Sequence, residues 1–403
     1  MAAEIAEQPD AVGRTVEALW PLRGALAELG AGARHVLFLA RGSSDNAATY
    51  GRYLCEVHAG RAASLGAPSL ATHYRAGTDL AGVLAVGLSQ SGETEEIVAA
   101  LRWAAERGAR TVAVTNAAGS ALATAADLAL VTAAGRERAV PATKTYTTQL
   151  AALAVLAAAL GPPDHAFDAA LARVPAAIAA MLATAAEAEK LAATLAAARA
   201  GIGGPGGSRS EMGPAPQEPA APTSAVAPPA GQPAVAPRRT GTVAPLAGGM
   251  VVSGRGLAYS TALELALKLE ETCYLPAIGL SHADLVHGPI AVLGPGTPAL
   301  LVAAGDGPVL PGMTALARSV ARRGGRAYGI GGDDAFKAAC AAALPGPDLP
   351  EALAPMALVV PGQLLVEALA RRLGLDPDRP RGLTKVTQTG GPAQEPHGGG
   401  GSS

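Results

Sequence analysis

Two parts of this chain open with the same pattern: an apolar run, then Arg-Gly, then a helical segment. VLFLARG at 36–42 precedes DNAATYGRYLCE, and MVVSGRG at 250–256 precedes AYSTALELALKLEE. Further apolar runs alternate with helical patterns after each of them, which is typical of a parallel sheet covered by helices on both faces. A pattern that restarts in this way indicates an internal duplication. The sequence therefore predicts an α/β fold made of two similar units.

The apolar periodicity predicts the main elements of each unit. In the first unit we expect strands at 35–40, 83–88, 111–115 and 128–132. Helices are expected over 44–59 and about 93–107, followed by two long helices within 146–200 that GPPD interrupts at 161–164. In the second unit we expect strands at 250–256, 299–305, 325–330 and 357–362.

The two units are separated by residues 203–248, which are dense in Pro, Gly and Ala. Such a segment buries too little apolar surface to offset its ordering entropy, so a disordered linker is expected. It is either a tolerated insertion or a docking site for a partner. The predicted division of the chain is a helical lead-in (1–34), a first domain (35–200), a linker (201–248), a second domain (249–375) and a C-terminal segment with a flexible tail (376–403).

Composition excludes several classes of protein. The formal net charge is −2 and aromatic residues make up 3% of the 403 residues, which argues against nucleic acid or an anionic membrane as a partner. Cys55, Cys273 and Cys340 lie far apart and form no disulfide framework, as expected in a reducing cytosol. The N-terminus lacks the apolar stretch of a signal peptide, so a cytoplasmic protein is predicted.

The stretch GLSQSGETEE at 87–96 places polar side chains between a predicted strand and a predicted helix. Helix N-termini attract anions, and Ser89, Gln90, Ser91 and Thr94 add hydrogen-bond donors, so the loop fits a phosphate cradle. Alternatively, Ser91 or Thr94 only caps the helix. Two further hydroxyl-rich clusters, RGSSDN and PATKTYTTQ, follow other strands. Three such loops at one sheet edge favour a bound sugar phosphate.

Other common sites are not expected. The loop has no Gly-Lys-Ser/Thr and GRG at 254–256 lacks the third glycine of a dinucleotide motif. His282 and His287 are five residues apart, which does not place them on one helical face, and no third ligand follows. We therefore predict neither a cofactor nor a metal.

The motifs resemble those of the sugar isomerase (SIS) family. LSQSGET, with ARGSS before it and AGRERAVPATKTYTTQ after it, is similar to the first SIS domain in the isomerase half of glucosamine-6-phosphate synthase. GRGLAYSTALELALKLEETCYLPAIGLSHADLVHGPIAVL resembles the second, and the segment ending in LTKVTQT resembles the C-terminal segment. The resemblance implies two tandem SIS domains, each a parallel sheet flanked by helices in a flavodoxin-like or Rossmann-like three-layer sandwich.

The resemblance also assigns roles to residues. Glu271 matches the carboxylate that moves a proton between C1 and C2, His287 matches the acid/base of ring opening, and Lys385 matches the lysine near the sugar carbonyl. Lys268 shares a helix face with Glu271. The positions that match sugar-phosphate binders are Gly42, Ser43, Ser44, Ser89, Gln90, Ser91, Thr94, Val140 and Ala142, the last of which is often Ser in the family.

Each assignment has a plainer alternative. Lys268 and Glu271 read alone as an exposed ion pair, His287 as a structural histidine, and Lys385 as a solvated lysine of the tail. Their occurrence together, in the order of the family, favours the functional interpretation.

The expected activity is that of an aldose–ketose isomerising deaminase, which converts glucosamine 6-phosphate and water to fructose 6-phosphate and ammonia. The ending LTKVTQT and the missing glutaminase unit with its N-terminal cysteine favour this direction. A fructosamine-phosphate deglycase and an ammonia-dependent synthase would use the same residues. A non-catalytic sugar-phosphate sensor is the alternative from another class, although the chain has no helix-turn-helix segment or basic patch. The resemblance further implies a homodimer with shared active sites.

Overall fold

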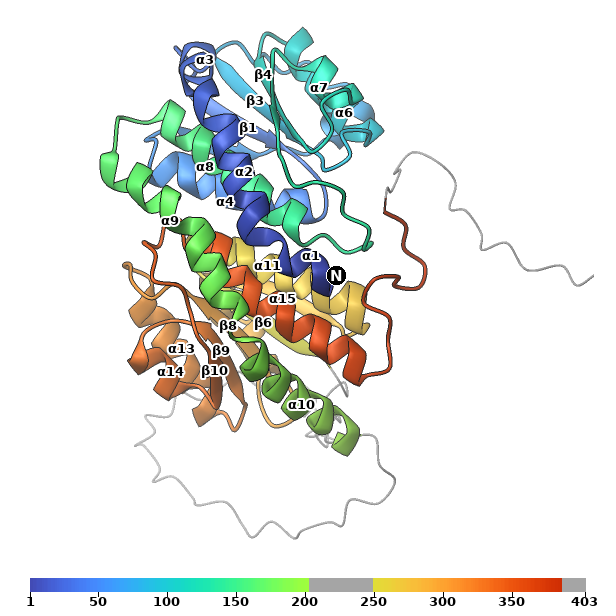
Figure 1. The fold of residues 1–403 in the computed structure, drawn as a ribbon, viewed down its shortest axis with the longest axis vertical. Helices are drawn as coiled ribbons and strands as arrows, with labels where there is room; N and C mark the ends of the chain where they lie inside the picture. Colours follow the sequence, from blue (N-terminus) through green and yellow to red (C-terminus); the bar gives the residue numbers. More distant parts are fainter. Residues whose placement is uncertain (203–248, 386–403) are drawn as a thin grey trace, which may run out of the picture.

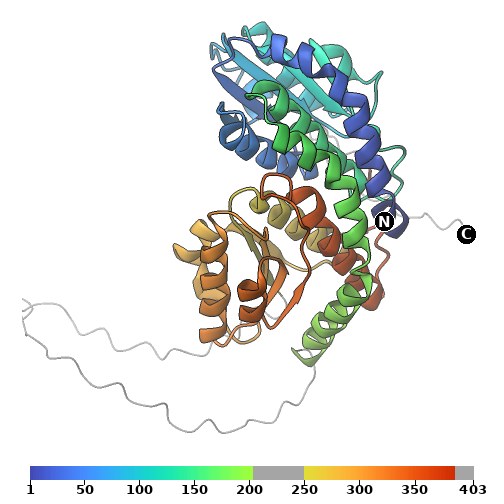
Figure 2. The same ribbon diagram turned by 60° about the vertical axis from the view of Figure 1, so that its left-hand side comes forward.

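The computed structural model describes residues 1–202 and 249–385, which form two domains stacked one above the other (Figures 1 and 2). Residues 203–248 of the predicted linker and 386–403 of the predicted C-terminal segment lie outside the described residues. Each domain contains one five-stranded parallel sheet with helices on its faces. The expected α/β fold with two similar domains is therefore confirmed.

The first domain holds the sheet with strand order β2-β1-β3-β4-β5. Its strands are β1 (His35–Leu39), β2 (Ala62–Leu65), β3 (Val83–Leu88), β4 (Arg110–Thr115) and β5 (Leu128–Val131). The helices around it are α4 (Ser43–Val57), α5 (Ser69–Thr72), α6 (Glu95–Glu106), α7 (Ala121–Ala125) and α8 (Lys144–Leu160). Four of these strands are those that the sequence predicts, and β2, a short edge strand, is not among them.

The second domain repeats this topology. Its strands are β6 (Met250–Gly254), β7 (Ala277–Ser281), β8 (Ala299–Ala303), β9 (Ala327–Gly331) and β10 (Ala342–Leu344), in the order β10-β9-β8-β6-β7. Read from the other edge, the two orders are identical, which supports the duplication. Its helices are α11 (Ala258–Cys273), α12 (His282–Val286), η2 (Pro289–Val292), α13 (Leu310–Arg322), α14 (Asp334–Ala339) and α15 (Pro355–Arg372).

One predicted strand is wrong. Residues 357–362 lie inside α15, whose residues are buried on almost every side. A short apolar run does not distinguish a buried strand from a buried helix, and here the apolar pattern continues for too many residues to be a strand. α15 packs on α9, α10 and α11.

The helical region after α8 also differs from the expectation. It contains α9 (His165–Leu182) and α10 (Ala185–Ile202). Together with α8, three helices therefore cover the region 146–200, for which the sequence predicts two. Ala183 and Thr184 separate α9 from α10, and the Thr184 hydroxyl donates to the Met181 carbonyl at 2.8 Å. Among the described residues, α9 alone has the length and hydropathy of a membrane span. Its buried residues recur every three or four positions where it packs on α2 and α15, as in a helix with one face in a core.

The chain begins with α1 (Ala2–Ala6), α2 (Gln8–Leu19), η1 (Trp20–Leu22) and α3 (Arg23–Leu29). α2 packs on α8 and α9, and α1 packs on α15 of the second domain. Between the domains, α4 packs directly on α11. These contacts join the domains through one large apolar core that contains residues of both sheets.

Candidate active site

The predicted phosphate loop lies between β3 and α6. The Ser89 hydroxyl accepts from the Gly92 amide at 3.2 Å and lies 3.0 Å from the Thr94 hydroxyl. The Ser91 hydroxyl accepts from the Glu93 amide at 3.2 Å. Gly92 has a φ of +68°, a conformation that favours glycine. Thr94 is the N-cap residue of α6, but its side chain makes no capping hydrogen bond there, so the alternative in which Thr94 only caps the helix is not supported.

The three hydroxyl-rich clusters meet at one cavity of about 320 Å³. Gly42, the N-cap of α4, has a φ of +58° and lets the chain turn from β1 into that helix. Gln149 of α8 donates from Nε2 to the Ser44 hydroxyl at 3.0 Å. Because α4 and α6 both begin at this cavity, their N-terminal amides give it the partial positive charge that binds anions.

Nearly all of the predicted site residues line this cavity. They are Gly42, Ser43, Ser44, Ser89, Gln90, Ser91, Thr94, Val140, Ala142, Glu271 and Lys385. These residues come from both domains and from the C-terminal segment, so the fold brings together residues that are far apart in the sequence. The two predicted residues outside the lining are Lys268 and His287.

Glu271 and Lys268 come from α11. The Glu271 side chain is 23% exposed at the cavity, whereas the Lys268 side chain is fully buried behind it and pairs with the Glu271 carboxylate. The Lys268 ammonium also lies 3.4 Å from the Glu264 carboxylate. The alternative of an exposed ion pair is therefore wrong. Burial lowers the pKa of Lys268, but the charges of Glu264 and Glu271 outweigh it and raise that pKa.

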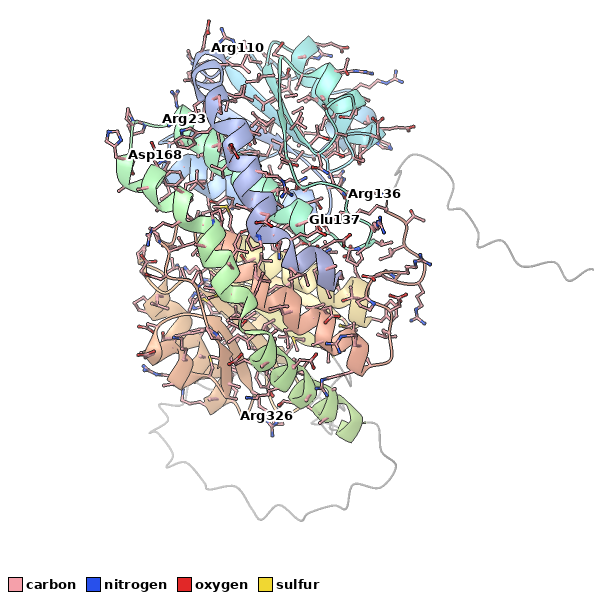
Figure 3. The ribbon with its side chains drawn as sticks, viewed as in Figure 1. Arg23, Arg110, Arg136, Glu137, Asp168 and Arg326 are labelled. Carbon is pink, nitrogen blue, oxygen red and sulfur yellow. The ribbon has the colours of Figure 1, made fainter. Side chains whose placement is uncertain are left out.

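Lys385 is held in place by the loop between β5 and α8. Its ammonium donates to Glu137 Oε2 at 2.6 Å and to the Ala139 carbonyl at 2.7 Å. Glu137 is fully buried between the domains, whereas the neighbouring Arg136 points to solvent (Figure 3). Lys385 is thus a fixed part of the cavity wall, and the alternative of a solvated tail lysine does not fit this geometry.

The Glu137 carboxylate receives several further hydrogen bonds. Thr143 donates its amide at 2.9 Å and its hydroxyl at 3.1 Å, and the Thr145 hydroxyl donates at 2.6 Å. Burial raises the pKa of Glu137, but the Lys385 charge and these donors outweigh burial and lower the pKa below its usual value. Glu137 therefore stays ionised opposite Lys385.

His287 lies apart from the cavity in this chain. It follows the last residue of α12, its side chain is exposed, and its amide donates to the Asp284 carbonyl at 3.2 Å. Its catalytic role stays a prediction.

The cavity also contains residues that the sequence did not single out: Arg41, Leu88, Ile97, Thr145, Tyr146, Gln149, Leu383 and Thr384. Thr145, Tyr146 and Gln149 belong to the third hydroxyl-rich cluster, so their signal was present. Arg41 forms a two-point ion pair with Glu96, with nitrogen–oxygen distances of 2.9 and 3.1 Å. Glu137 had no signal, because GRERA reads as a charged surface turn.

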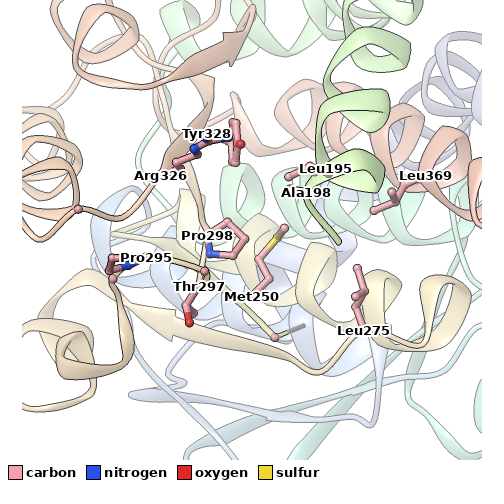
Figure 4. A pocket seen from close by; sticks show the side chains of 14 residues that line it. Leu195, Ala198, Met250, Leu275, Pro295, Thr297, Pro298, Arg326, Tyr328 and Leu369 are labelled. Atoms are coloured by element: carbon pink, nitrogen blue, oxygen red, sulfur yellow. The ribbon is translucent and has the colours of Figure 1, made fainter. Parts of the chain in front are cut away.

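A second cavity, of about 380 Å³, lies beside the second sheet (Figure 4). It is lined by residues at the beginnings of strands, such as Met250 and Tyr328, and by Leu195 and Leu369 of two helices. Ligands of open α/β sheets bind at the opposite, carboxyl ends of the strands.

Among the described residues, no three His, Cys, Asp or Glu side chains form a metal-binding group.

Comparison with known proteins agrees with this fold. The model of the SIS domain matches residues 31–159 and 247–366. The chain belongs to the SIS domain family. It is 31% identical over 390 residues to glutamine–fructose-6-phosphate aminotransferase [isomerizing] of Aquifex aeolicus, which covers 96% of this chain and 57% of that protein. The chain thus spans little more than half the length of the curated relatives it matches.

Solved structures show the same architecture. The C-terminal domain of glucosamine-fructose-6-phosphate aminotransferase from Francisella tularensis is 25% identical, with a TM-score of 0.73 and coverage of 94% of this chain and 97% of that chain. Glucosamine-6-phosphate deaminase from Thermotoga maritima has a TM-score of 0.65 at 20% identity, with coverage of 96% and 99%. The second likeness concerns the fold alone.

Proposed function

We propose that this SIS protein isomerises and deaminates an amino-sugar phosphate, converting glucosamine 6-phosphate and water to fructose 6-phosphate and ammonia. One observation carries the proposal: the donor-rich cradle, Glu271 and Lys385 line the same cavity. The cradle offers a site for the phosphate, and the other two side chains lie where the sugar carbons would react. The names of the relatives support a sugar phosphate as the substrate class.

In this proposal the phosphate serves as a handle. The hydroxyls of Ser44, Ser89 and Ser91 and the N-termini of α4 and α6 hold it, which orients the sugar in the cavity. Gln149 is buried, and its Oε1 has no hydrogen-bond partner among the described residues. A buried acceptor without a partner is costly, and a sugar hydroxyl would satisfy it.

The chemistry consists of proton transfers. After ring opening, the Glu271 carboxylate removes the proton from C2 and returns it to C1, which turns the 2-amino aldose into a 2-imino ketose. Water adds to the C2 imine, and ammonia leaves as the C2 carbonyl forms. The sum is one sugar phosphate and one water in, one ketose phosphate and one ammonia out, with no change of oxidation state.

Lys385 would act at the carbonyl end of the sugar. Its ammonium, held by Glu137 and two backbone carbonyls, is placed to stabilise negative charge on a substrate oxygen. A covalent imine with the substrate would require Lys385 to leave Glu137 and lose a proton first.

The reverse direction is the second candidate. Curated relatives are named as glutamine–fructose-6-phosphate aminotransferases. The proposed proton transfers can run in either direction with the same residues. With ammonia supplied, the chain would then convert fructose 6-phosphate to glucosamine 6-phosphate.

A shared site between two copies completes the proposal. His287 is exposed and lies outside the cavity of its own chain, so its predicted role in ring opening requires a second subunit. Mixing Glu271→Gln with His287→Ala chains tests this, because a mixed dimer contains one site with neither substitution. Each variant alone should be inactive and the mixture should recover activity; no recovery after proven subunit exchange refutes the shared site.

The direct test measures ammonia and fructose 6-phosphate released from glucosamine 6-phosphate. Glu271→Gln should lower kcat by at least ~100-fold, the lower range for a general base, while the sugar phosphate still binds. Glu106→Gln, at an exposed position of α6 outside the cavity lining, is the control for the same change of side chain and should keep its rate.

The other outcomes separate the alternatives. Turnover only from fructose 6-phosphate with ammonia would establish the reverse direction. Turnover only of a fructosamine phosphate would identify a deglycase. Saturable binding without turnover of any of these compounds would refute the enzyme and favour a sensor.

A further inference from the structure

Glu264 is a fully buried carboxylate on α11, two helical turns before Glu271. It faces the first turn of α4, which belongs to the other domain. Ser43 donates its hydroxyl to Oε1 at 2.9 Å, and Asn46 donates its amide to Oε2 at 2.8 Å. Both oxygens of one second-domain carboxylate are therefore occupied by donors from the first turn of α4, which begins at the cavity.

The same carboxylate lies 3.4 Å from the Lys268 ammonium, which in turn pairs with Glu271. Lys268 is fully buried, so its charge depends on these two carboxylates. Burial raises the pKa of Glu264, and the Lys268 charge and the Asn46 hydrogen bond partly oppose it. Tyr146 and Glu137 are the other titratable groups near enough to feel this pair.

The arrangement joins the two chemical ends of the cavity. Ser43 lines the phosphate side and Glu271 lines the reacting side, while Glu264 and Lys268 lie behind the wall and do not line it. We propose that Glu264 is a positioning residue: it fixes the first turn of α4 directly and, by sharing Lys268, sets how tightly the Glu271 carboxylate is held. This inference rests on the proposed function.

Loss of the Glu264 charge has a defined consequence. Glu271 would then be the one carboxylate of α11 that pairs with the Lys268 ammonium, so the Lys268–Glu271 ion pair would become tighter. A carboxylate in a tighter ion pair accepts the C2 proton less readily. Binding of the phosphate should change little, because a glutamine at 264 still accepts one hydrogen bond and the Asn46 amide can turn to accept the other.

The test compares wild type, Glu264→Gln and the control Glu106→Gln, an exposed carboxylate of α6 outside the cavity lining, with glucosamine 6-phosphate. We expect Glu264→Gln to lower kcat at least ~10-fold while KM changes less than ~3-fold, a split that marks loss in the transition state rather than in binding. The acidic limb of the kcat–pH profile should move to lower pH in Glu264→Gln and stay unchanged in Glu106→Gln. A loss of folded protein alone would leave that limb in place.

A second variant separates positioning from folding. Glu264→Gln with Lys268→Met replaces the buried pair by neutral side chains, which should restore thermal stability toward that of wild type. Its rate should rise above that of Glu264→Gln, because the tightened ion pair on Glu271 is gone. Recovered stability with no gain in rate would overturn the proposal, as would a Glu264→Gln protein with the kcat and pH profile of wild type. An inactive wild-type protein would instead refute the proposed function, and the inference with it.

Discussion

Glu137→Gln should weaken the anchor of the C-terminal segment by an amount that the contacts define. A glutamine at 137 has one acceptor oxygen, which can face either the Thr143 amide or the Lys385 ammonium. Its NH₂ group then faces the other of these two donors and cannot accept a hydrogen bond from it. One charge-assisted hydrogen bond is lost, which costs about 1.5–3 kcal/mol. Since the Lys385 side chain is 25% exposed and can turn to water, we expect a loss of about 2 kcal/mol in the free energy of unfolding.

The pH dependence gives this prediction a sign. The pKa of Glu137 is lowered in the folded protein, so its stabilising contribution is present above its unfolded value of 4.5 and is lost as the pH falls through the folded value. Urea unfolding followed by circular dichroism should therefore show the full difference between wild type and Glu137→Gln near neutral pH. The difference should shrink as the pH is lowered below 4.5.

The control for this experiment is Arg136→Gln, at the adjacent exposed position, which should change the free energy of unfolding by less than ~0.5 kcal/mol. A Glu137→Gln protein as stable as this control, or a difference that does not vary with pH, would show that the buried pair with Lys385 does not hold the segment.

Two further predictions concern the first domain. In Gly92→Ala the new Cβ would lie 2.1 Å from the Ser120 hydroxyl, and the alanine would have to keep the φ of +68° that Gly92 adopts. This backbone conformation costs about 1–2 kcal/mol for a residue with a Cβ. The strained loop and the displaced Ser120 should raise KM for the sugar phosphate by ~10-fold or more. Gly119→Ala, with nothing within 4 Å of the new Cβ, should keep the wild-type KM, and equal values for both variants would contradict the cradle. Burial, and to a smaller extent the negative charge of Glu56, raise the pKa of the Cys55 thiol to about 12. Ellman's reagent should therefore label Cys55 only after unfolding. Rapid labelling of native Cys55 would show that α4 opens.

Local patterns with a direct physical cause were predictable from the sequence. The strand–Arg-Gly–helix repeat indicated the duplicated α/β fold, and the hydroxyl clusters after strands indicated a common edge, because parallel strands end at the same side. The apolar run at 357–362 was misread, since burial on all sides removes the periodicity that distinguishes a helix from a strand.

Features that depend on distant partners were not predictable in this way. Glu137 is buried and pairs with Lys385, at the far end of the described chain, as well as with Thr143 and Thr145. Lys268 is buried in α11, which packs against α4 of the other domain as well as against α15. The domain limits and the roles of His287 and the other site residues remain predictions.

The contact between α4 and α11 joins two helices that hold equivalent places in the two copies. A single copy could bury this helix only against an identical neighbour, and an isologous interface requires each residue to suit the same partner twice. In one covalent chain that requirement disappears. Aligning the two Arg-Gly pairs makes Leu257 the counterpart of Ser43 and Tyr50 the counterpart of Glu264. In the α4–α11 contact, the Ser43–Glu264 side could therefore evolve a charged group that connects to Glu271. The Tyr50–Leu257 side could keep apolar and aromatic packing.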